Sequence, residues 1–338
     1  MSLETTFPTT PPTPPRLPPM RRLAARCMRN PLGGVIAALV LIFGVSCLLS
    51  PHFLTGFNMM IMARALAFIG LVTIGQSILM ILGELDLSVG AIGGLAGITG
   101  GMLMVQAGLN PWLSLVLCLL LGTACGMLNG VLITLLRLHS LVLTIGMAGV
   151  YGGAILVATK GVAITGVPVD ISFLGRGLVY GVPVPFIVLL ACLGVVAFVM
   201  VRTPVGRYVY AIGSNPDAAR MLGLRVDAIR IAAFATAGFL SALAGILMVA
   251  RLGTAQPSIG DTWVLAPIAA AVIGGVATTG GLGSPVGAVL GAVIIGMIEN
   301  IIVLFGISPY WQSVVSGGIV VLAISFDSLA RRYLHREA

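Results

Sequence analysis

The chain has 338 residues, of which 58% are hydrophobic and only 8% charged, with a formal net charge of +8. Soluble globular domains carry about 25% charged residues, so this composition excludes a soluble domain and indicates a polytopic membrane protein. The basic residues flank apolar runs and are not interleaved with stacking aromatic residues, which argues against a nucleic-acid partner.

The first thirty residues (1–30) combine a Pro/Thr-rich stretch with five arginines. They have no apolar periodicity, so we expect a disordered, basic tail on the cytoplasmic side. The apolar run Leu32–Leu49 follows and is long enough to cross a bilayer. A signal peptide is the alternative, but no small-residue cleavage site comes after this run. We therefore interpret it as an uncleaved first span.

Further apolar segments continue to the C-terminus, and together they predict an all-α polytopic fold of about ten transmembrane helices. Several are shorter than the roughly 20 residues that a crossing needs, so broken or oblique helices are expected. We expect residues 31–330 to form one membrane domain and 331–338 a basic cytoplasmic tail. The nine further segments are Ala65–Leu82, Val89–Val105, Trp112–Leu136, Leu141–Ala158, Val184–Val201, Ile231–Ala250, Val264–Thr279, Val286–Phe305 and Trp311–Ile324.

The distribution of basic residues tests this topology. With ten spans and both termini cytoplasmic, fourteen of the eighteen basic residues lie on the cytoplasmic side, as the positive-inside rule predicts. Arg64, Lys160, Arg176 and Arg251 remain for the outer side. The largest external loop is then 160–183, whose many Gly and Pro residues favour turns over a separate domain. This loop is either a plain connector or a contact for an external partner.

The loop 202–230 is the longest polar segment after residue 31 and carries five arginines. Within it, Asn215 is a suitable N-cap, Pro216 suits the first helical position, and Asp217 suits the first turn. Gly223 can adopt the left-handed conformation that ends a helix. We therefore predict a short helix over Pro216–Leu222, presented outside the bilayer as a docking element.

The segment Gly83–Gly90 places Glu84 and Asp86 between two apolar runs. Carboxylates at membrane depth are costly, so they lie at the cytoplasmic mouth or face a protein-lined cavity. The flanking glycines suit a broken helix, and Asp86 with Ser88 can cap the next span. Capping and direct contact with a solute are both open, and the two are compatible.

A second Gly-rich break, Ile273–Gly287, also separates two apolar runs. Paired interrupted segments point to the solute path of a transporter, although a tight turn with close helix contacts is the alternative. Polar residues inside or beside spans should face the bundle interior, as interhelical hydrogen-bonding groups or as solute contacts. The candidates for the path are Asp86, Ser88, Gln76, Asn129, Thr144 and Asn300.

Other polar and small residues predict no chemistry. Glycines at a spacing of four recur in three spans (Gly122, Gly126 and Gly130; Gly149 and Gly153; Gly287 and Gly291), where they favour close helix packing. The five cysteines and three histidines show no metal-ligand spacing. The single lysine lacks the preceding glycine loop of an ATP site. We therefore expect no enzyme activity, no metal and no cofactor on this chain.

Three stretches resemble the permease subunits of bacterial ABC importers of the ribose (monosaccharide) type. Gly83–Gly90 resembles the family's Gly-Gly-Ile-Asp-Leu-Ser-Val-Gly signature, and Gly206–Val226 resembles the cytoplasmic loop that docks on the ATPase. The third stretch is Ile268–Gly287 together with the run Trp311–Gly317. The likeness covers about Leu32 to Asp327.

The resemblance implies a multi-pass subunit of the bacterial inner membrane. Its partners would be ABC ATPase subunits, a second permease copy or a sister permease, and a periplasmic binding protein that delivers a sugar. ATP chemistry would then lie on another chain. The resemblance also assigns the coupling helix that enters the ATPase, and its residues would be Asn215, Pro216, Asp217, Ala218, Ala219, Arg220 and Gly223.

The sequence departs from the family pattern at three places: Glu84 replaces a usual Gly, His139-Ser140-Leu141 replaces a Pro-Phe-Ile-like start, and Trp263–Pro267 lacks the usual acidic residues. These departures leave the solute open, since related permeases carry branched-chain amino acids, nucleosides or autoinducer-2. A different class, an ion- or proton-coupled secondary transporter that uses Glu84, Asp86 or Glu299, is the alternative function. Such a carrier needs no docking helix.

Overall fold

The computed structural model describes residues 31–308, 310–312, 314–315, 317–318 and 321. Eight helices among these residues are long and apolar enough to cross a membrane. The predicted tails 1–30 and 331–338 lie outside the described residues, and so does half of the expected span Trp311–Ile324. The chain is a mostly helical polytopic membrane protein, as the composition predicts.

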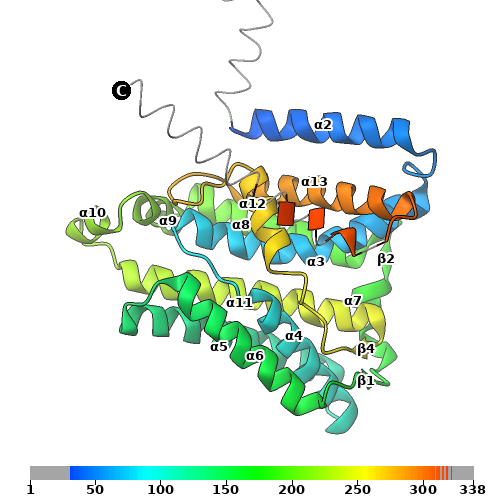
Figure 1. The fold of residues 1–338 in the computed structure, drawn as a ribbon. Coiled ribbons are helices and arrows are strands. Elements are labelled where there is room, and N and C mark those ends of the chain that lie inside the picture. The colour runs from blue at the N-terminus through cyan, green and yellow to red at the C-terminus, as the bar shows by residue number, and fades with distance from the viewer. Residues whose placement is uncertain (1–30, 309, 313, 316, 319–320, 322–338) are drawn as a thin grey trace, which may run out of the picture.

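The helices follow one another with short connections (Figure 1). Two short antiparallel pairings join β1 with β4 and β2 with β3. The π-helix η1 (Met102–Gln106) continues α4, and the 3-10 helix η2 (Val169–Ile171) precedes α7. The remaining bounds are α2 (Pro31–Leu49), α3 (Gly56–Ile81), α4 (Val89–Gly101), α5 (Pro111–Leu136), α6 (Ser140–Thr159), β1 (Ile164–Thr165), α7 (Ser172–Arg176), β2 (Leu178–Val179), β3 (Val182–Pro183), α8 (Val184–Arg202), α9 (Pro204–Ser214), α10 (Pro216–Met221), α11 (Val226–Leu252), β4 (Thr254–Ala255), α12 (Leu265–Ile273) and α13 (Pro285–Leu304).

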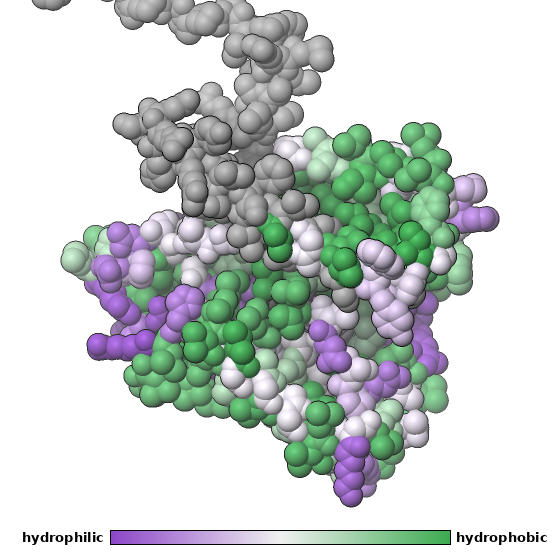
Figure 2. Space-filling model, in the orientation of Figure 1, coloured by the Kyte–Doolittle hydropathy of each residue, from purple (hydrophilic) through white to green (hydrophobic). Residues whose placement is uncertain are grey.

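Two helices form the centre of the bundle. α11 packs on α3, α4 and α5, while α3 also contacts α8, α12 and α13. α2 lies outside this arrangement and packs along α13 (Figure 1). The largest buried side chains include Phe68 on α3 and Phe234 on α11, which belong to the main core cluster. The outward faces of the long helices are apolar, as expected for surfaces that meet lipid (Figure 2).

Small residues allow α5 and α11 to approach closely. A Cβ atom on Gly126 would collide with the Phe234 carbonyl oxygen, and one on Gly238 would collide with the Gly122 carbonyl oxygen. The predicted packing role of the α5 glycines is confirmed, and Gly287 and Gly291 pack in the same way on α12. The prediction is wrong for Gly149 and Gly153 within this chain, because no described atom lies within 4 Å of a Cβ built there.

The bundle has two opposite ends. We call one the α10 end; it holds α9, α10, the 82–88 turn and the 274–284 loop. Here the Gly281 N–H donates to the Ile81 carbonyl at 2.8 Å. The β-strand end holds both strand pairs and α7, with Ile164 opposite Ala255. Hydrophilic side chains gather at both ends, and apolar ones cover the helices between them (Figure 2).

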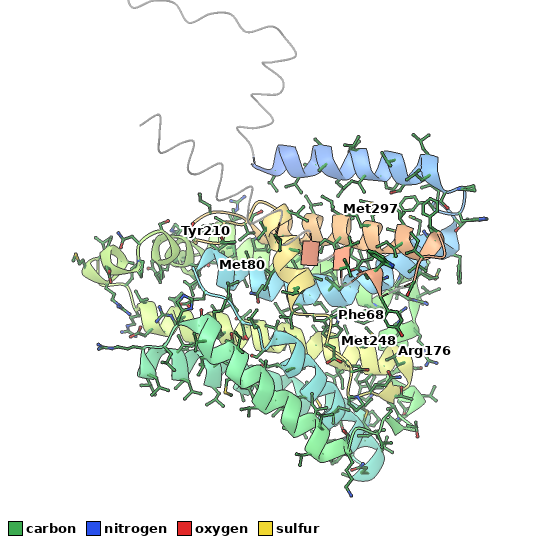
Figure 3. All side chains as sticks on the ribbon, in the orientation of Figure 1. Phe68, Met80, Arg176, Tyr210, Met248 and Met297 are labelled. Carbon is green, nitrogen blue, oxygen red and sulfur yellow. The ribbon has the colours of Figure 1, made fainter. Side chains whose placement is uncertain are left out.

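Three of the four basic residues expected outside lie together at the β-strand end. The Arg64 guanidinium donates to the Arg176 carbonyl at 2.9 Å, and the Arg176 Nε donates to the Arg251 carbonyl at 2.6 Å. The Arg251 guanidinium lies 5.5 Å from the centre of the Phe68 ring. Figure 3 shows Phe68 and Arg176 on the same side of the bundle. These three basic residues thus share one end of the bundle.

The expected span Val264–Thr279 is not a membrane-long helix. Only nine residues, Leu265–Ile273, form α12, because Gly274 and Gly275 end it and Pro267 lies near its start. The segment 254–284 nevertheless passes from β4, at the β-strand end, to Gly281 at the α10 end. It therefore connects the two ends of the bundle through a short helix and an irregular stretch, which agrees with the expected broken helices.

Candidate functional site

The short helix predicted within the loop 202–230 is present as α10. The Asn215 side chain accepts hydrogen bonds from the N–H groups of Asp217 and Ala218, at 3.1 and 3.0 Å, and Pro216 occupies the first turn. At the other end, Gly223 has a φ of +80°, and its N–H donates to the Arg220 carbonyl at 2.9 Å. The Leu224 N–H donates to the Ala219 carbonyl at 3.1 Å, which completes a Schellman stop. The predicted helix is thus confirmed to within a residue.

The exposed part of α10 includes two apolar side chains that the sequence interpretation passed over. Met221 is 89% exposed and Leu222 is 80% exposed, whereas Ala219 is buried against the bundle. Exposed apolar groups at the tip of a polar element are typical of a contact surface. The signal in the sequence was the Met-Leu pair placed directly before the helix-ending glycine.

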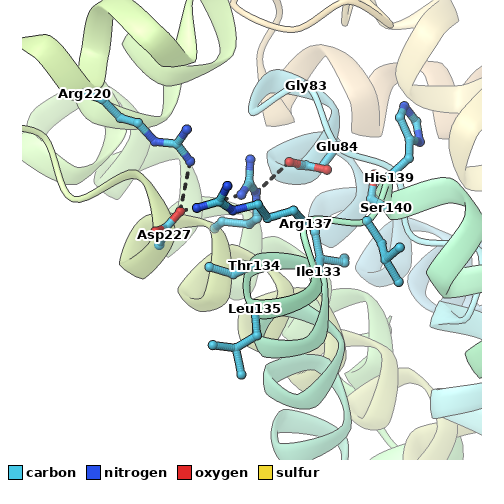
Figure 4. A pocket seen from close by; sticks show the side chains of 12 residues that line it. Gly83, Glu84, Ile133, Thr134, Leu135, Arg137, His139, Ser140, Arg220 and Asp227 are labelled. Carbon is cyan, nitrogen blue, oxygen red and sulfur yellow. Dashed lines mark hydrogen bonds and ion pairs between the residues drawn. The ribbon is translucent and has the colours of Figure 1, made fainter.

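A chain of ion pairs connects α10 with the 82–88 turn (Figure 4). Arg220 lies 3.2 Å from Asp227 and 4.0 Å from Asp217. Arg230 lies 3.7 Å from Asp227 and 2.7 Å from Glu84. The Arg220 pairs are solvent-exposed and contribute little, but the Arg230–Glu84 pair is mostly buried, with side chains 18% and 12% exposed. Glu84 is therefore held by α11, the helix that begins beside α10.

These groups line an open, polar cavity of about 1030 Å³ at the α10 end. Its walls come from the 82–88 turn, the junction of α5 with α6, and the beginning of α11 (Figure 4). Arg137 takes a left-handed conformation at this junction, with a φ of +54°. The cavity lies between the helix that presents α10 and the turn that carries the carboxylates.

The backbone of the 82–88 turn is held by hydroxyl groups of α6. The Leu85 N–H donates to the Ser140 hydroxyl at 3.2 Å, and the Leu87 N–H donates to the Thr144 hydroxyl at 3.1 Å. Ser140 and Thr144 are four residues apart and so share one face of the helix. Alternate N–H groups of an extended segment point the same way, which explains why this spacing fits.

The Asp86 side chain points into a closed polar cluster and is fully buried. It accepts from the Ser88 N–H at 2.8 Å and the Ser88 hydroxyl at 2.6 Å, and Asn129 donates to it at 3.4 Å. Asn129 also donates to the Ser88 hydroxyl at 2.8 Å, and the Tyr151 hydroxyl lies 3.0 Å from the Asn129 side-chain oxygen. The cluster thus ties the turn to α5 and α6 and stabilises the entry to α4.

Four of the six path candidates, Asp86, Ser88, Asn129 and Thr144, therefore come together around one turn. Tyr151 was missed, although it lies seven residues after Thr144 and hence on the same face of α6. Gln76 is buried on α3, and both polar atoms of its side chain lack a hydrogen-bond partner among the described residues. Asn300 lies elsewhere, where it exchanges hydrogen bonds of 2.9 and 2.8 Å with Asn58.

The two predicted breaks in the helical pattern also meet. A Cβ on Gly280 would lie 2.9 Å from the Gly83 Cα, and the Tyr210 hydroxyl of α9 donates to the Gly283 carbonyl at 2.9 Å. Figure 3 shows Tyr210 where α9 meets this loop. Tyr210 lies outside the spanning helices, and burial raises the pKa of its hydroxyl. α9 is thus attached to the loop that follows α12.

The comparisons with known proteins agree with this arrangement. The family model described as "Branched-chain amino acid transport system / permease component" matches residues 58–324. The ribose import permease protein of Bacillus subtilis is 37% identical over 299 residues, which is 88% of this chain and 92% of the relative. The ribose import permease protein of Haemophilus influenzae is 32% identical, covering 86% of this chain and 91% of its own.

A relative with a different named solute is also similar. The autoinducer 2 import system permease protein of Yersinia enterocolitica is 35% identical over 268 residues, or 79% of this chain and 74% of the relative. No solved structure matches. The family model covers most of the chain and two ribose import permeases match it at above 30% identity, so the protein belongs to this family of membrane-embedded transport permeases.

Proposed function

We propose that this chain is the permease subunit of an ATP-driven importer and forms the path for a monosaccharide or a similar small polar solute. The observation that carries the proposal is α10, a helix capped at both ends that presents exposed apolar side chains outside the bundle. The named functions of the relatives supply the solute class: ribose for two of them and autoinducer 2 for a third. Nucleosides and branched-chain amino acids are the other solutes to test.

In this proposal, α10 enters a cleft on a separate ATPase subunit. Met221 and Leu222 make the apolar contact, while Asp217 and Arg220 contribute polar contacts at its rim. Movement of α10 reaches the membrane through α11, because Arg230 near its start holds Glu84 at 2.7 Å. The 82–88 turn follows, and α4 moves with it since Asp86 and Ser88 fix the entry to that helix. Rocking of packed elements around a central path is how alternating access works in many transporters.

The proposal also fixes the orientation of the molecule. The α10 end is cytoplasmic, both termini are cytoplasmic, and the chain makes ten crossings of the bacterial inner membrane. The supporting observations are the loop 202–230 with its five arginines and the broken crossing 254–284. The β-strand end then faces the periplasm, where a binding protein delivers the solute. A second permease copy or a sister permease completes the path.

The alternative of a secondary transporter, with Glu84, Asp86 or Glu299 as its coupling residue, finds no support at the first two of these residues. Glu84 is paired with Arg230, and Asp86 is closed off inside a hydrogen-bonded cluster. The family match also favours the permease over a self-sufficient carrier. A proton-coupling carboxylate must exchange protons with water during transport, which the closed cluster around Asp86 does not allow in this conformation.

The test is uptake by proteoliposomes that contain this permease with its ATPase and binding protein, with D-ribose as the probe. Uptake should require ATP on the side of the vesicle membrane where the ATPase lies. A proton or sodium gradient imposed without ATP should give no uptake. Uphill uptake on an ion gradient with the permease alone would overturn the proposal. ATP-dependent uptake of another solute from the panel would correct the solute class only.

A second experiment tests the docking surface. The double substitution Met221→Ser and Leu222→Ser should reduce copurification of the ATPase about tenfold, because it removes the exposed apolar contact. Val169→Ser is the matched control, since Val169 is 80% exposed at the β-strand end. Equal ATPase binding by the two variants would argue against α10 as the docking helix.

A further inference from the structure

The segment 256–264, between β4 and α12, crosses the interior of the bundle without forming a regular helix. It lies directly on α4, because a Cβ on Gly90 would collide with the Gly260 carbonyl, and one on Gly260 with that of Gly90. One turn later, Gly93 lies against the Ser241 carbonyl, near the middle of α11. The segment is therefore at the depth of the middle of a spanning helix.

A cavity of about 590 Å³ opens beside this segment, between α4 and α6. This volume is typical of sites that bind small molecules. Its walls are mostly apolar and include Leu87, Ile155 and Ile259, while Ser258 and Asp261 provide polar groups. Figure 2 shows hydrophilic colour in the middle of this face, over the stretch between β4 and α12.

Asp261 is the one ionisable residue among the described residues that line this cavity. It is exposed, and its side chain makes no hydrogen bond or ion pair with the rest of the described chain. A carboxylate at membrane depth costs at least about 2.5 kcal/mol on insertion scales. Irregular backbone at that depth is tolerated where it lines a wet or protein-enclosed space. Both features indicate that the Asp261 carboxylate faces water or a polar molecule.

α6 forms one wall of the cavity through Ala148, Gly152, Ile155 and Leu156. No described atom lies within 4 Å of a Cβ built on Gly149, Gly152 or Gly153. This face of α6 is therefore not used for packing within the chain, and it leaves room beside the cavity. The permease partner of the proposed function would close this side.

We propose that this cavity is a solute subsite in which the Asp261 carboxylate accepts hydrogen bonds from hydroxyl groups of a neutral, polyhydroxylated solute. The inference rests on the proposed function and names a residue of its path. A carboxylate in a mostly apolar wall repels anions, and no Arg, Lys or His lines the cavity to compensate. The apolar walls suit the C–H faces of a sugar ring. Ser258 adds a neutral hydrogen-bonding group on the same segment.

The experiment measures initial rates of ATP-driven uptake of D-ribose and 2-deoxy-D-ribose by the complete importer in proteoliposomes. Asp261→Ala should lower ribose uptake about tenfold, since hydrogen bonds to charged groups are the strong ones. Asp261→Asn should lower it less, because the amide oxygen still accepts a hydrogen bond. Asp170→Asn, an exposed carboxylate in η2, is the matched control and should transport like the wild type.

A second readout separates contact with the solute from a structural role. If Asp261 binds hydroxyl groups, the ratio of ribose to deoxyribose uptake should fall toward one in Asp261→Ala, while the ATPase activity of the complex without solute is unchanged. Equal loss for both sugars, or a wild-type rate in Asp261→Ala, would overturn the subsite. No ATP-driven ribose uptake by the wild type would instead refute the monosaccharide proposal on which the subsite rests.

Discussion

Charged side chains are paired with one another at the α10 end, whereas the carboxylate in the crossing segment 256–264 has no partner in the described chain. At the α10 end, Arg220, Asp227, Arg230 and Glu84 pair with one another in a continuous chain. In the crossing segment, Asp261 is left without a partner from the described chain. Paired charges hold elements in a fixed relation, whereas an unpaired carboxylate remains available to a ligand. Under the proposed function, the paired charges at the α10 end serve to transmit movement, and the unpaired carboxylate of the interior segment serves to contact the solute.

The two regions are connected through α11. Its beginning carries Arg230 and Asp227 at the α10 end, and its middle lies at the depth of the segment 256–264. α5 supports α11 along this length through the glycine contacts at Gly122, Gly126 and Gly130. In the proposed mechanism, this close α5–α11 packing transmits a movement of α10 to the cavity. The first variant below disrupts the α5–α11 contact. The next variants disrupt the Arg230–Glu84 pair and then the end of α10.

The largest effect is expected from Gly126→Val. The new side chain would collide with the backbone of α11 at Phe234, which a rotamer change cannot relieve. We expect the monodisperse fraction after detergent extraction to fall about tenfold, as measured by size-exclusion chromatography. Gly194→Val on α8 is the control and should behave as the wild type, because the space around Gly194 is open. Equal yields of the two variants would contradict the close α5–α11 packing.

A smaller effect is expected from breaking the Arg230–Glu84 pair. Glu84→Gln or Arg230→Gln leaves a mostly buried charge without its partner, which should cost about 1–2 kcal/mol and lower the Tm by about 5 °C. ATP-driven uptake should fall more than ATP hydrolysis, because coupling is impaired. The double variant Glu84→Gln with Arg230→Gln should recover most of the Tm, since neither charge is left alone. Additive losses of Tm in the double variant would show that the pair is not energetically coupled.

The smallest effect is expected at the end of α10. Gly223 has a φ of +80° and open space around it, so Gly223→Val disturbs the backbone conformation without a steric clash. The left-handed conformation costs a β-branched residue about 1–2 kcal/mol, which should weaken ATPase binding about tenfold and leave the Tm unchanged. Gly223→Asn is the matched control, because Asn tolerates this conformation. Pull-down of the ATPase measures its affinity for each variant. Similar losses of affinity in Gly223→Val and Gly223→Asn would rule out the role of the helix stop.

Local chemistry in the sequence was enough to predict several features. The apolar runs predicted a polytopic helical bundle, because the bilayer core has no water to hydrogen-bond the free N–H and C=O groups of an irregular backbone. Asn215, Pro216 and Gly223 predicted α10 nearly to the residue, because capping depends on neighbours a few positions apart. The α5 glycines predicted close packing for the same local reason, although their partner helix could not be named.

Tertiary structure alone decided the rest. The expected span Val264–Thr279 is a short helix preceded by an irregular segment. Hydropathy contains no information on the close contact between the two backbones at Gly90 and Gly260. The roles of Glu84 and Asp86 diverged because α11 brings Arg230 to one and α5 brings Asn129 to the other. The sequence did not single out Asp261 as a candidate residue. Its position in the cavity and its lack of a partner in the described chain are visible only in the structure. Contacts between residues far apart along the chain decide burial and pairing, and no local pattern contains them.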